Sequence, residues 1–121
     1  MIGVGIDAVD LDRFRRVLER RPRIVERLFS EAERRDLAGR RDPVPGLAAR
    51  FAAKEAAWKA LGCGLGATGF ADVEVVRTAT GAPALRVSRA ARTLADSLGV
   101  TEWYVSMTHT DSLAQAIVIA R

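Results

Sequence analysis

The sequence predicts an α+β fold in which a mainly antiparallel sheet packs against one long central helix. Three observations lead to this prediction. Segments with the period-two alternation of β-strands occur near both ends of the chain, the alanine-rich stretch 47–61 is the strongest helix signal, and neighbouring strand signals are joined by short turns. With 121 residues, of which 49% are hydrophobic, the chain can bury a core of its own, and we predict a single domain over residues 1–121.

The first half of the chain predicts one strand followed by helices. Apolar residues alternate with glycines and an aspartate over residues 2–7, which is typical of a strand with one apolar face. A helical period then begins, with arginines on its polar side, and a second short helical piece follows Pro22. Ser30 and Glu33 have the spacing of a capping box, which predicts a further helix, and the proline-containing segment 40–46 predicts a loop.

The second half predicts the long helix, a glycine loop and most of the sheet. The helix over 47–61 contains no glycine, proline or β-branched residue, and the segment 62–66 carries three glycines. Ser88 is a candidate cap for another helix, which would end near Gly99. We predict strands at 70–78, 83–88, 103–109 and 113–119, the first two joined as a hairpin.

Basic charge is concentrated in one segment. The net charge is +4, yet residues 13–27 alone carry seven arginines against two glutamates, so the rest of the chain sums to −1. Such an arm favours an acidic partner through long-range attraction, and a solvated basic face is the simplest alternative. An arginine-rich helix is also typical of nucleic-acid-binding modules, but among the seven aromatic residues no cluster typical of RNA readers stands out, so no nucleic-acid partner is expected.

Membrane and disulfide signals are weak. The apolar runs are much shorter than the roughly 20 residues that a membrane-spanning helix needs. Acidic residues also lie too near the N-terminus for a signal peptide. The single cysteine, Cys63, has no partner in the chain for a disulfide, and no Cys/His cluster is present that could bind zinc. We therefore expect a cytoplasmic location and no membrane partner.

Two carboxylates stand in apolar settings. On a helical wheel at about 100° per residue, Glu55 falls within the apolar stripe of the long helix, and Asp7 follows a strand of Ile, Val and Gly. A carboxylate in such a setting should be protonated, paired or bound to a cation, because desolvation costs roughly several kcal/mol. An i,i+4 pair of Glu55 with Lys59, worth about 0.3–0.5 kcal/mol on an exposed helix, is the simplest explanation for Glu55 alone.

Asp7 and Glu55 together favour a shared divalent cation. Oxygen ligands without nearby His or Cys suit Mg²⁺, which commonly takes one or two carboxylates and completes its shell with phosphate and water. Cations and backbone N–H groups for a phosphate lie within two helical turns of Glu55, on Arg50, Lys54, Lys59 and the loop 62–66.

Three segments resemble the holo-acyl-carrier-protein synthases of the 4'-phosphopantetheinyl transferase superfamily. They are GIDAVDLDRF (Gly5 to Phe14), RFAAKEAAWKALGCGLG (Arg50 to Gly66) and VSMTHT (Val105 to Thr110), in family order and at family spacing. The resemblance implies the 4'-phosphopantetheinyl transferase fold. It also implies transfer of 4'-phosphopantetheine from coenzyme A to a serine of apo-acyl carrier protein in fatty-acid and lipid biosynthesis, with release of adenosine 3',5'-bisphosphate. A homotrimer with active sites at subunit interfaces is implied as well.

The resemblance assigns roles to individual residues. Mg²⁺ is expected on Asp7 and Glu55, and Glu55 and Lys59 are the expected catalytic residues. For removal of the serine proton three candidates remain: Glu55, a metal-bound water and Lys59. Contacts with coenzyme A are expected from Arg50, Lys59, Gly62, Gly64, Gly66, Thr108 and His109. His109 is the only histidine in the chain, and without the resemblance it would be interpreted as a packed structural residue.

The arginine arm is interpreted as the docking surface for an acidic acyl carrier protein. The residues expected to make contact are Arg13, Val17, Arg20, Arg23, Ile24, Arg27 and Leu28. A family relative that binds coenzyme A or carrier protein without catalysis is the main alternative, and retention of Asp7, Glu55 and Lys59 argues against it. Cys63 and Trp58 depart from the family pattern without removing a proposed ligand.

Overall fold

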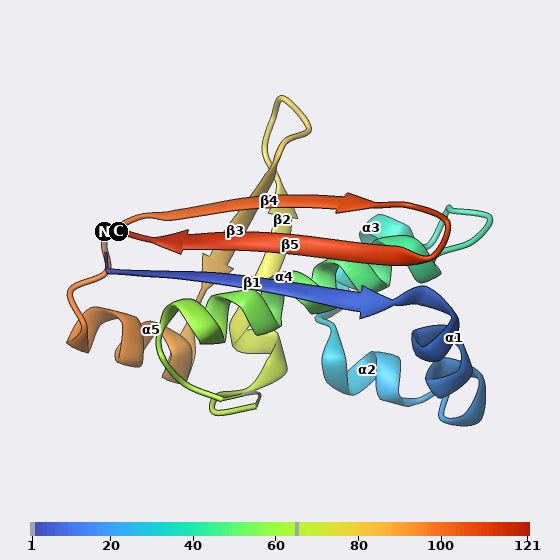
Figure 1. Ribbon diagram of the computed structural model, residues 1–121, viewed down its shortest axis with the longest axis horizontal. Helices are drawn as coiled ribbons and strands as arrows, with labels where there is room; N and C mark the ends of the chain where they lie inside the picture. Colours follow the sequence, from blue (N-terminus) through green and yellow to red (C-terminus); the bar gives the residue numbers. More distant parts are fainter. Residues whose placement is uncertain (1, 65) are drawn as a thin grey trace.

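The fold is an antiparallel sheet covered on one face by helices, with a separate hairpin beside it (Figure 1). The computed structural model describes residues 2–64 and 66–121. In chain order the elements are β1 (Gly3–Asp10), α1 (Leu11–Arg20), α2 (Ile24–Leu28), α3 (Glu31–Leu37), α4 (Val44–Ala60), the 3-10 turn η1 (Phe70–Asp72), β2 (Val73–Arg77), β3 (Pro83–Val87), α5 (Arg89–Ser97), β4 (Trp103–His109) and β5 (Leu113–Ala120). The α+β prediction with a mainly antiparallel sheet and a long central helix is confirmed.

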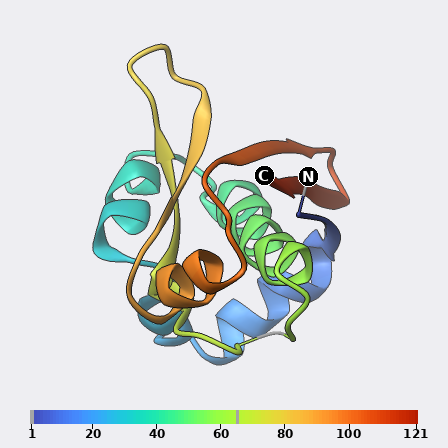
Figure 2. The same cartoon turned by 90° about the vertical axis from the view of Figure 1, so that its left-hand side faces the viewer.

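The main sheet has the strand order β1-β5-β4, so the first and last strands of the chain pair side by side. Helix α4 lies against the inner face of this sheet, while no helix of the described residues covers the outer face (Figure 2). Strands β2 and β3 form a second, two-stranded antiparallel sheet that projects past the main one. The main sheet therefore has one face in the core and one face bare.

Two glycines let β1 approach α4 closely. A Cβ atom at Gly5 would overlap the carbonyl oxygen of Ala56, and one at Gly3 would overlap that of Ala60. Both glycines stand on the inner face of β1, where the neighbouring inward position is Asp7. Because Gly3 and Gly5 have no side chain, β1 lies close to α4 and Asp7 lies against the helix.

Gly5→Ala is expected to destabilise the protein by roughly 1–3 kcal/mol or more, because strand and helix would have to move apart. Urea denaturation measures the effect. Gly39→Ala is the matched control, since nothing lies within 4 Å of a Cβ at that position. Equal denaturation midpoints for the two variants would contradict the close approach.

Helix α4 differs from the prediction in two ways. It begins at Val44 instead of Leu47, because Pro45 occupies its first turn, where the missing N–H costs no hydrogen bond. It also has no single apolar stripe: alanines cover most of its circumference and are buried against the sheets. The prediction that Glu55 lies within an apolar stripe is therefore wrong, and Glu55 belongs to the least buried strip of the helix.

Lys54 has a structural role in place of the phosphate contact that the sequence suggested. Its side chain is fully buried, and Nζ donates to Glu33 Oε1 at 2.7 Å and to the carbonyl oxygens of Phe70 and Val73. Glu33 completes the predicted capping box with Ser30, and its Oε2 accepts from the backbone N–H of Val75 at 3.1 Å. This pair joins α4 to the start of α3 and to β2.

The remaining elements follow the prediction with two differences. The strand predicted from Phe70 begins at Val73, since the first three residues form η1. Helix α5 does start after Ser88, but the Ser88 side chain makes no cap hydrogen bond. Among the described residues no helix is long and apolar enough to cross a membrane.

Candidate active site

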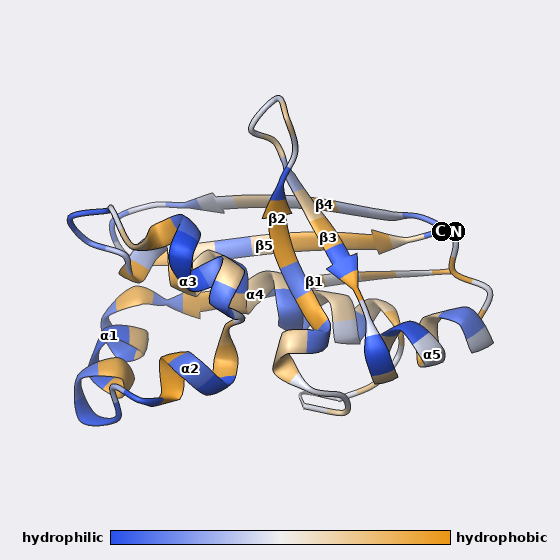
Figure 3. Cartoon of the chain, turned by 180° about the vertical axis from the view of Figure 1, so that it is seen from behind, coloured by the Kyte–Doolittle hydropathy of each residue, from blue (hydrophilic) through white to orange (hydrophobic). Residues whose placement is uncertain are grey.

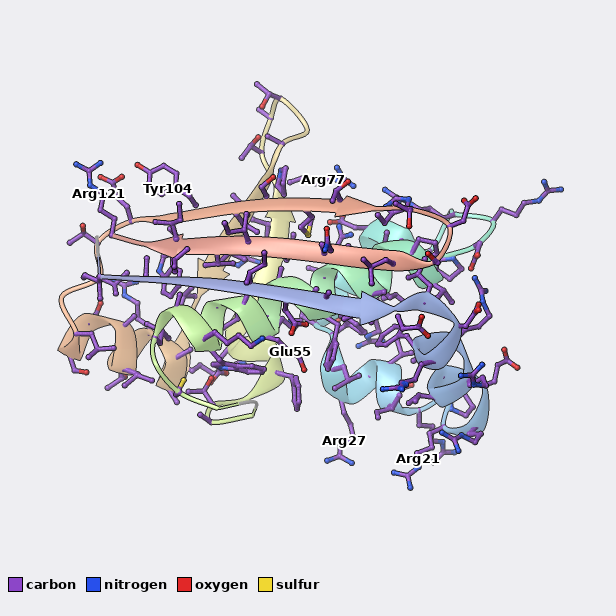
Figure 4. All side chains as sticks on the ribbon, in the orientation of Figure 1. Arg21, Arg27, Glu55, Arg77, Tyr104 and Arg121 are labelled. Atoms are coloured by element: carbon purple, nitrogen blue, oxygen red, sulfur yellow. The ribbon has the colours of Figure 1, made fainter. Side chains whose placement is uncertain are left out.

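Asp7, Glu55 and Lys59 meet where β1 passes over α4. Lys59 Nζ lies 3.1 Å from Asp7 Oδ1 and donates to the carbonyl oxygen of Ile6 at 3.0 Å. Glu55, one turn before Lys59, projects from α4 beneath β1 (Figure 4) and is close enough to Asp7 to hydrogen-bond with it. The structure thus brings together the three residues that the sequence assigned to metal binding and catalysis.

The pKa of the Glu55 carboxyl is raised well above its ordinary value. Burial, followed by the hydrogen bond and the negative charge of Asp7, raises the pKa of Glu55 from 4.5 to about 8, although the positive charge of Lys59 acts in the opposite direction. At neutral pH Glu55 is therefore largely protonated. A divalent cation that binds here must displace this proton.

The raised pKa of Glu55 predicts how the stability of the protein depends on pH. Since the folded pKa of about 8 exceeds the ordinary value of 4.5, the folded protein binds more protons between these values than the unfolded chain does. The contribution of Glu55 to the free energy of unfolding is complete below about pH 4.5 and is lost as the pH rises through 8. Urea denaturation in EDTA from pH 5 to 8 should show this decline, and Glu55→Gln should reduce it. Identical pH slopes for both proteins would contradict the assignment.

The pair fits a hard divalent cation. Asp7 Oδ2 is buried and has no hydrogen-bond partner in the described part of the chain, so one ligand atom is already unsatisfied. No group of three or more His, Cys, Asp or Glu side chains gathers within residues 2–64 and 66–121. A cation here would take two carboxylates from this chain and its other ligands from substrate and water, which is common for Mg²⁺.

A second cluster surrounds the buried Arg50. Its side chain is 1% exposed, Nε and Nη2 have no hydrogen-bond partner among the described residues, and the nearest carboxylate, Asp36, is 3.6 Å away. Burial, and then the positive charge of Arg77, lower the pKa of Arg50. A cavity of about 200 Å³, the Arg50 cavity, is lined by Arg40, Gly46, Ala49, Arg50, Arg77, Pro83, Met107, Thr108 and His109. Three arginines around one small cavity are chemically suited to an anion.

Arg40 and Arg77 were missed by the sequence analysis. They come from the loop before α4 and from the end of β2, and no local pattern connects them with Arg50. Figure 4 shows Arg77 beside β4, at the base of the projecting hairpin. Only the fold brings these guanidinium groups together.

The two clusters are separate within one chain. Arg50 and Glu55 leave α4 about 140° apart at five residues' separation. Asp7 lies on β1 and His109 on β4, the two outer strands of the main sheet, with β5 between them. The structure therefore does not bring Arg50, Thr108 and His109 to the Asp7–Glu55–Lys59 cluster of the same chain.

The glycines Gly62, Gly64 and Gly66 follow the end of α4, close to Lys59 in the chain. Gly62 and Gly66 have φ of +75° and +74°, which other residues rarely adopt, and Gly64 has open space around it. Trp58 anchors the loop, because its Nε1 donates to Thr68 Oγ1 at 2.9 Å and its carbonyl oxygen accepts from the Cys63 backbone. The role of these glycines in binding coenzyme A stays a prediction.

A groove of about 640 Å³ runs from the helices α1 and α2 to Glu55. We call it the α1–α2 groove; its lining includes Arg13, Phe14, Val17, Ile24, Leu28, Phe51 and Glu55. Four of the seven predicted docking residues are in this list, although Leu28, at 8% exposure, is a wall of the groove and not an exposed contact. Arg20, Arg23 and Arg27 are exposed nearby, and Arg27 points away from α2 (Figure 4). Hydrophilic and hydrophobic residues alternate along both helices (Figure 3).

Comparison with known proteins decides the family. The model of the 4'-phosphopantetheinyl transferase superfamily matches residues 3–118. The chain belongs to this superfamily. Among its relatives, the holo-[acyl-carrier-protein] synthase of Streptomyces coelicolor is 48% identical over 120 residues, covering 99% of this chain and 97% of the relative. The synthase of Streptomyces avermitilis is 47% identical with the same coverage.

Solved structures of superfamily members agree with this assignment. The holo-[acyl-carrier-protein] synthase of Neisseria meningitidis superposes with a TM-score of 0.91 at 31% identity, covering 100% of this chain and 99% of that one. The synthase of Bacillus anthracis, solved in complex with coenzyme A (3',5'-ADP), gives a TM-score of 0.81 at 32% identity and covers 98% and 95%. The 4'-phosphopantetheinyl transferase fold implied by the sequence is confirmed.

Proposed function

We propose that this transferase is a holo-[acyl-carrier-protein] synthase, which moves the 4'-phosphopantetheine group of coenzyme A onto a serine of apo-acyl carrier protein. The observation that carries the proposal is the Asp7–Glu55–Lys59 cluster at the inner end of the α1–α2 groove. Two carboxylates and an ammonium group suit a pyrophosphate and its counter-ion, and the exposed arginines beside the groove suit an acidic protein acceptor.

The reaction forms one P–O bond and breaks another. The serine hydroxyl oxygen attacks the β-phosphorus of coenzyme A, the bond from that phosphorus to the bridging oxygen breaks, and adenosine 3',5'-bisphosphate leaves with the electron pair. The serine proton passes to a base of the site. Negative charge grows on the departing phosphate, so fixed positive groups at this position lower the barrier.

Asp7 and Glu55 would hold Mg²⁺, which when bound supplies positive charge to the pyrophosphate. Lys59 is 54% exposed at its side chain and reaches Asp7 from the open side of the cluster. With Mg²⁺ on the two carboxylates, the Lys59 ammonium group would be free to hydrogen-bond a phosphate oxygen. The unpaired Oδ2 of Asp7 supports this arrangement.

The Arg50 cavity would bind the nucleotide end of coenzyme A. Guanidinium groups with unused N–H donors suit a phosphate monoester, and Thr108 and His109 lie in the same cavity. Because this cavity and the carboxylate cluster occupy opposite edges of the sheet, we propose that one coenzyme A binds across two copies of the chain. Such an arrangement requires a cyclic assembly, for which the predicted homotrimer is suitable.

The bare outer face of the main sheet supports self-association. Its exposed apolar side chains include Val4 at 53%, Ile6 at 62%, Tyr104 at 48% and Ile117 at 40% exposure. The strand register places these residues side by side across β1, β5 and β4. An apolar patch of this kind on one sheet face is typical of a protein interface.

Docking of the carrier protein would use the arginines around the α1–α2 groove. Arg23→Glu is expected to raise the KM for carrier protein roughly tenfold at low salt, because the variant repels an acidic partner, and to leave kcat little changed. The difference should disappear in high salt. Arg121→Glu is the control, since Arg121 lies at the end of the molecule remote from α1 (Figure 4). An equal effect of both variants would argue against this docking surface.

Mass spectrometry tests the proposed reaction directly. Apo-carrier protein incubated with enzyme, coenzyme A and Mg²⁺ should gain the mass of one phosphopantetheine group, with adenosine 3',5'-bisphosphate as the second product. Without Mg²⁺ and in EDTA the gain should be much slower. Absence of the mass shift under all conditions would refute the function.

A further inference from the structure

A second apolar hollow lies on the helical side of the molecule, outside the proposed active site. It has a volume of about 290 Å³ and lies among α1, α2, α3 and α4. Its principal lining residues are Leu18, Val25, Arg34, Leu37, Val44 and Leu47. We call it the four-helix hollow. Its size is close to the lower end of the range of about 300–1,000 Å³ that small-molecule sites occupy.

The hollow contains one charged side chain, and that side chain has an unused donor. Nε of Arg34 is buried and has no hydrogen-bond partner among the described residues, and no carboxylate of the described chain lies within 4.0 Å of its guanidinium group. The next residue, Arg35, differs in both respects, because it is exposed and paired with Glu31 at 3.2 Å. A buried N–H group without a partner is unfavourable, and an anionic ligand would satisfy it.

The four-helix hollow is separate from the α1–α2 groove. Neighbouring residues of the same helices face the two spaces: Val17 and Ile24 line the groove, whereas Leu18 and Val25 line the hollow. The walls of the hollow are aliphatic, so they offer no partners for the hydroxyl groups of a sugar or the edges of a base. A ligand that fits both features has an aliphatic body and one negative charge.

We propose that the four-helix hollow binds an aliphatic carboxylate of medium chain length. The chain lies among the leucine and valine side chains of the four helices, and the carboxylate accepts hydrogen bonds from Arg34. Charge-assisted hydrogen bonds of this kind are stronger than neutral ones, so the acid is preferred over an alcohol of the same length. This binding does not depend on the proposed transferase activity.

Methyl NMR of the wild-type protein tests the proposal. Octanoate, added below the concentration at which it aggregates, should shift the methyl signals of Leu18, Val25, Leu37 and Leu47. Octan-1-ol and octylammonium have the same chain with no charge or the opposite charge. Octanoate should bind roughly ten- to a hundredfold more tightly than octan-1-ol, and octylammonium should bind least.

A matched pair of variants isolates the charge. Arg34→Met keeps the aliphatic stem, removes an unpaired donor and should weaken octanoate binding roughly ten- to a hundredfold without affecting octan-1-ol. Arg35→Met, one residue further along α3, should leave both affinities unchanged. The proposal is overturned if octan-1-ol binds wild type as tightly as octanoate, if the shifted methyl groups lie elsewhere, or if Arg34→Met and Arg35→Met behave alike.

Discussion

Glu55→Gln is expected to reduce the rate of phosphopantetheine transfer about 10²- to 10³-fold or more while the fold stays intact. The amide cannot supply the negative charge that a divalent cation requires, and it no longer completes the carboxylate pair with Asp7. The fold should survive because Glu55 is largely protonated in the metal-free protein, and an uncharged glutamine resembles that form. Transfer is measured by mass spectrometry of apo-carrier protein, and folding by circular dichroism and thermal unfolding.

Glu31→Gln is the matched control for this loss of activity. Glu31 pairs with Arg35 on the surface of α3, and both side chains are strongly exposed. The control variant should transfer at the wild-type rate. Calorimetry adds a readout that does not depend on turnover, because Glu55→Gln should also abolish measurable Mg²⁺ binding. A Glu55→Gln protein that is folded and retains most of its activity would exclude Glu55 from the reaction.

Activity is expected to return when two inactive variants are combined in one assembly. If coenzyme A binds between the carboxylate cluster of one copy and the Arg50 cavity of another, Glu55→Gln and Arg50→Met damage opposite halves of each site. In randomly mixed cyclic trimers from co-expression, about one quarter of the sites contain two intact halves. Transfer should therefore reach about a quarter of the wild-type rate, although each variant alone is inactive.

A second mixture provides the control for this experiment. Lys59 belongs to the same half of the site as Glu55, so mixed assemblies of Glu55→Gln and Lys59→Gln contain no intact carboxylate cluster. They should stay inactive. Recovery in both mixtures, or in neither when light scattering shows trimers, would contradict a site shared between copies. Val4→Asp, on the bare sheet face, should prevent assembly and remove activity in every mixture.

The sequence predicted the chemical groups of the candidate site better than it predicted their arrangement in space. Asp7 and Glu55 were identified because carboxylates are conspicuous in largely apolar segments, whereas the role of Lys59 came from the family resemblance. The setting of Glu55 was predicted wrongly, because a wheel drawn for one helix assumes one buried side, whereas α4 has sheets and helices on most of its sides. The structural role of Lys54 was not predicted, because its partner Glu33 is 21 residues away in the chain and only packing brings the two side chains together.

The sequence by itself predicted the order and type of most elements and the family, because these depend on local periodicity and on short motifs. The residues of the reaction stay a prediction. The tertiary structure alone decided which charged groups meet. Pairing of β1 with β5, and the glycines that bring β1 onto α4, place Asp7 beside Glu55, while β5 keeps them apart from His109. Contacts between residues far apart in the chain follow from strand order and packing, which local patterns do not specify.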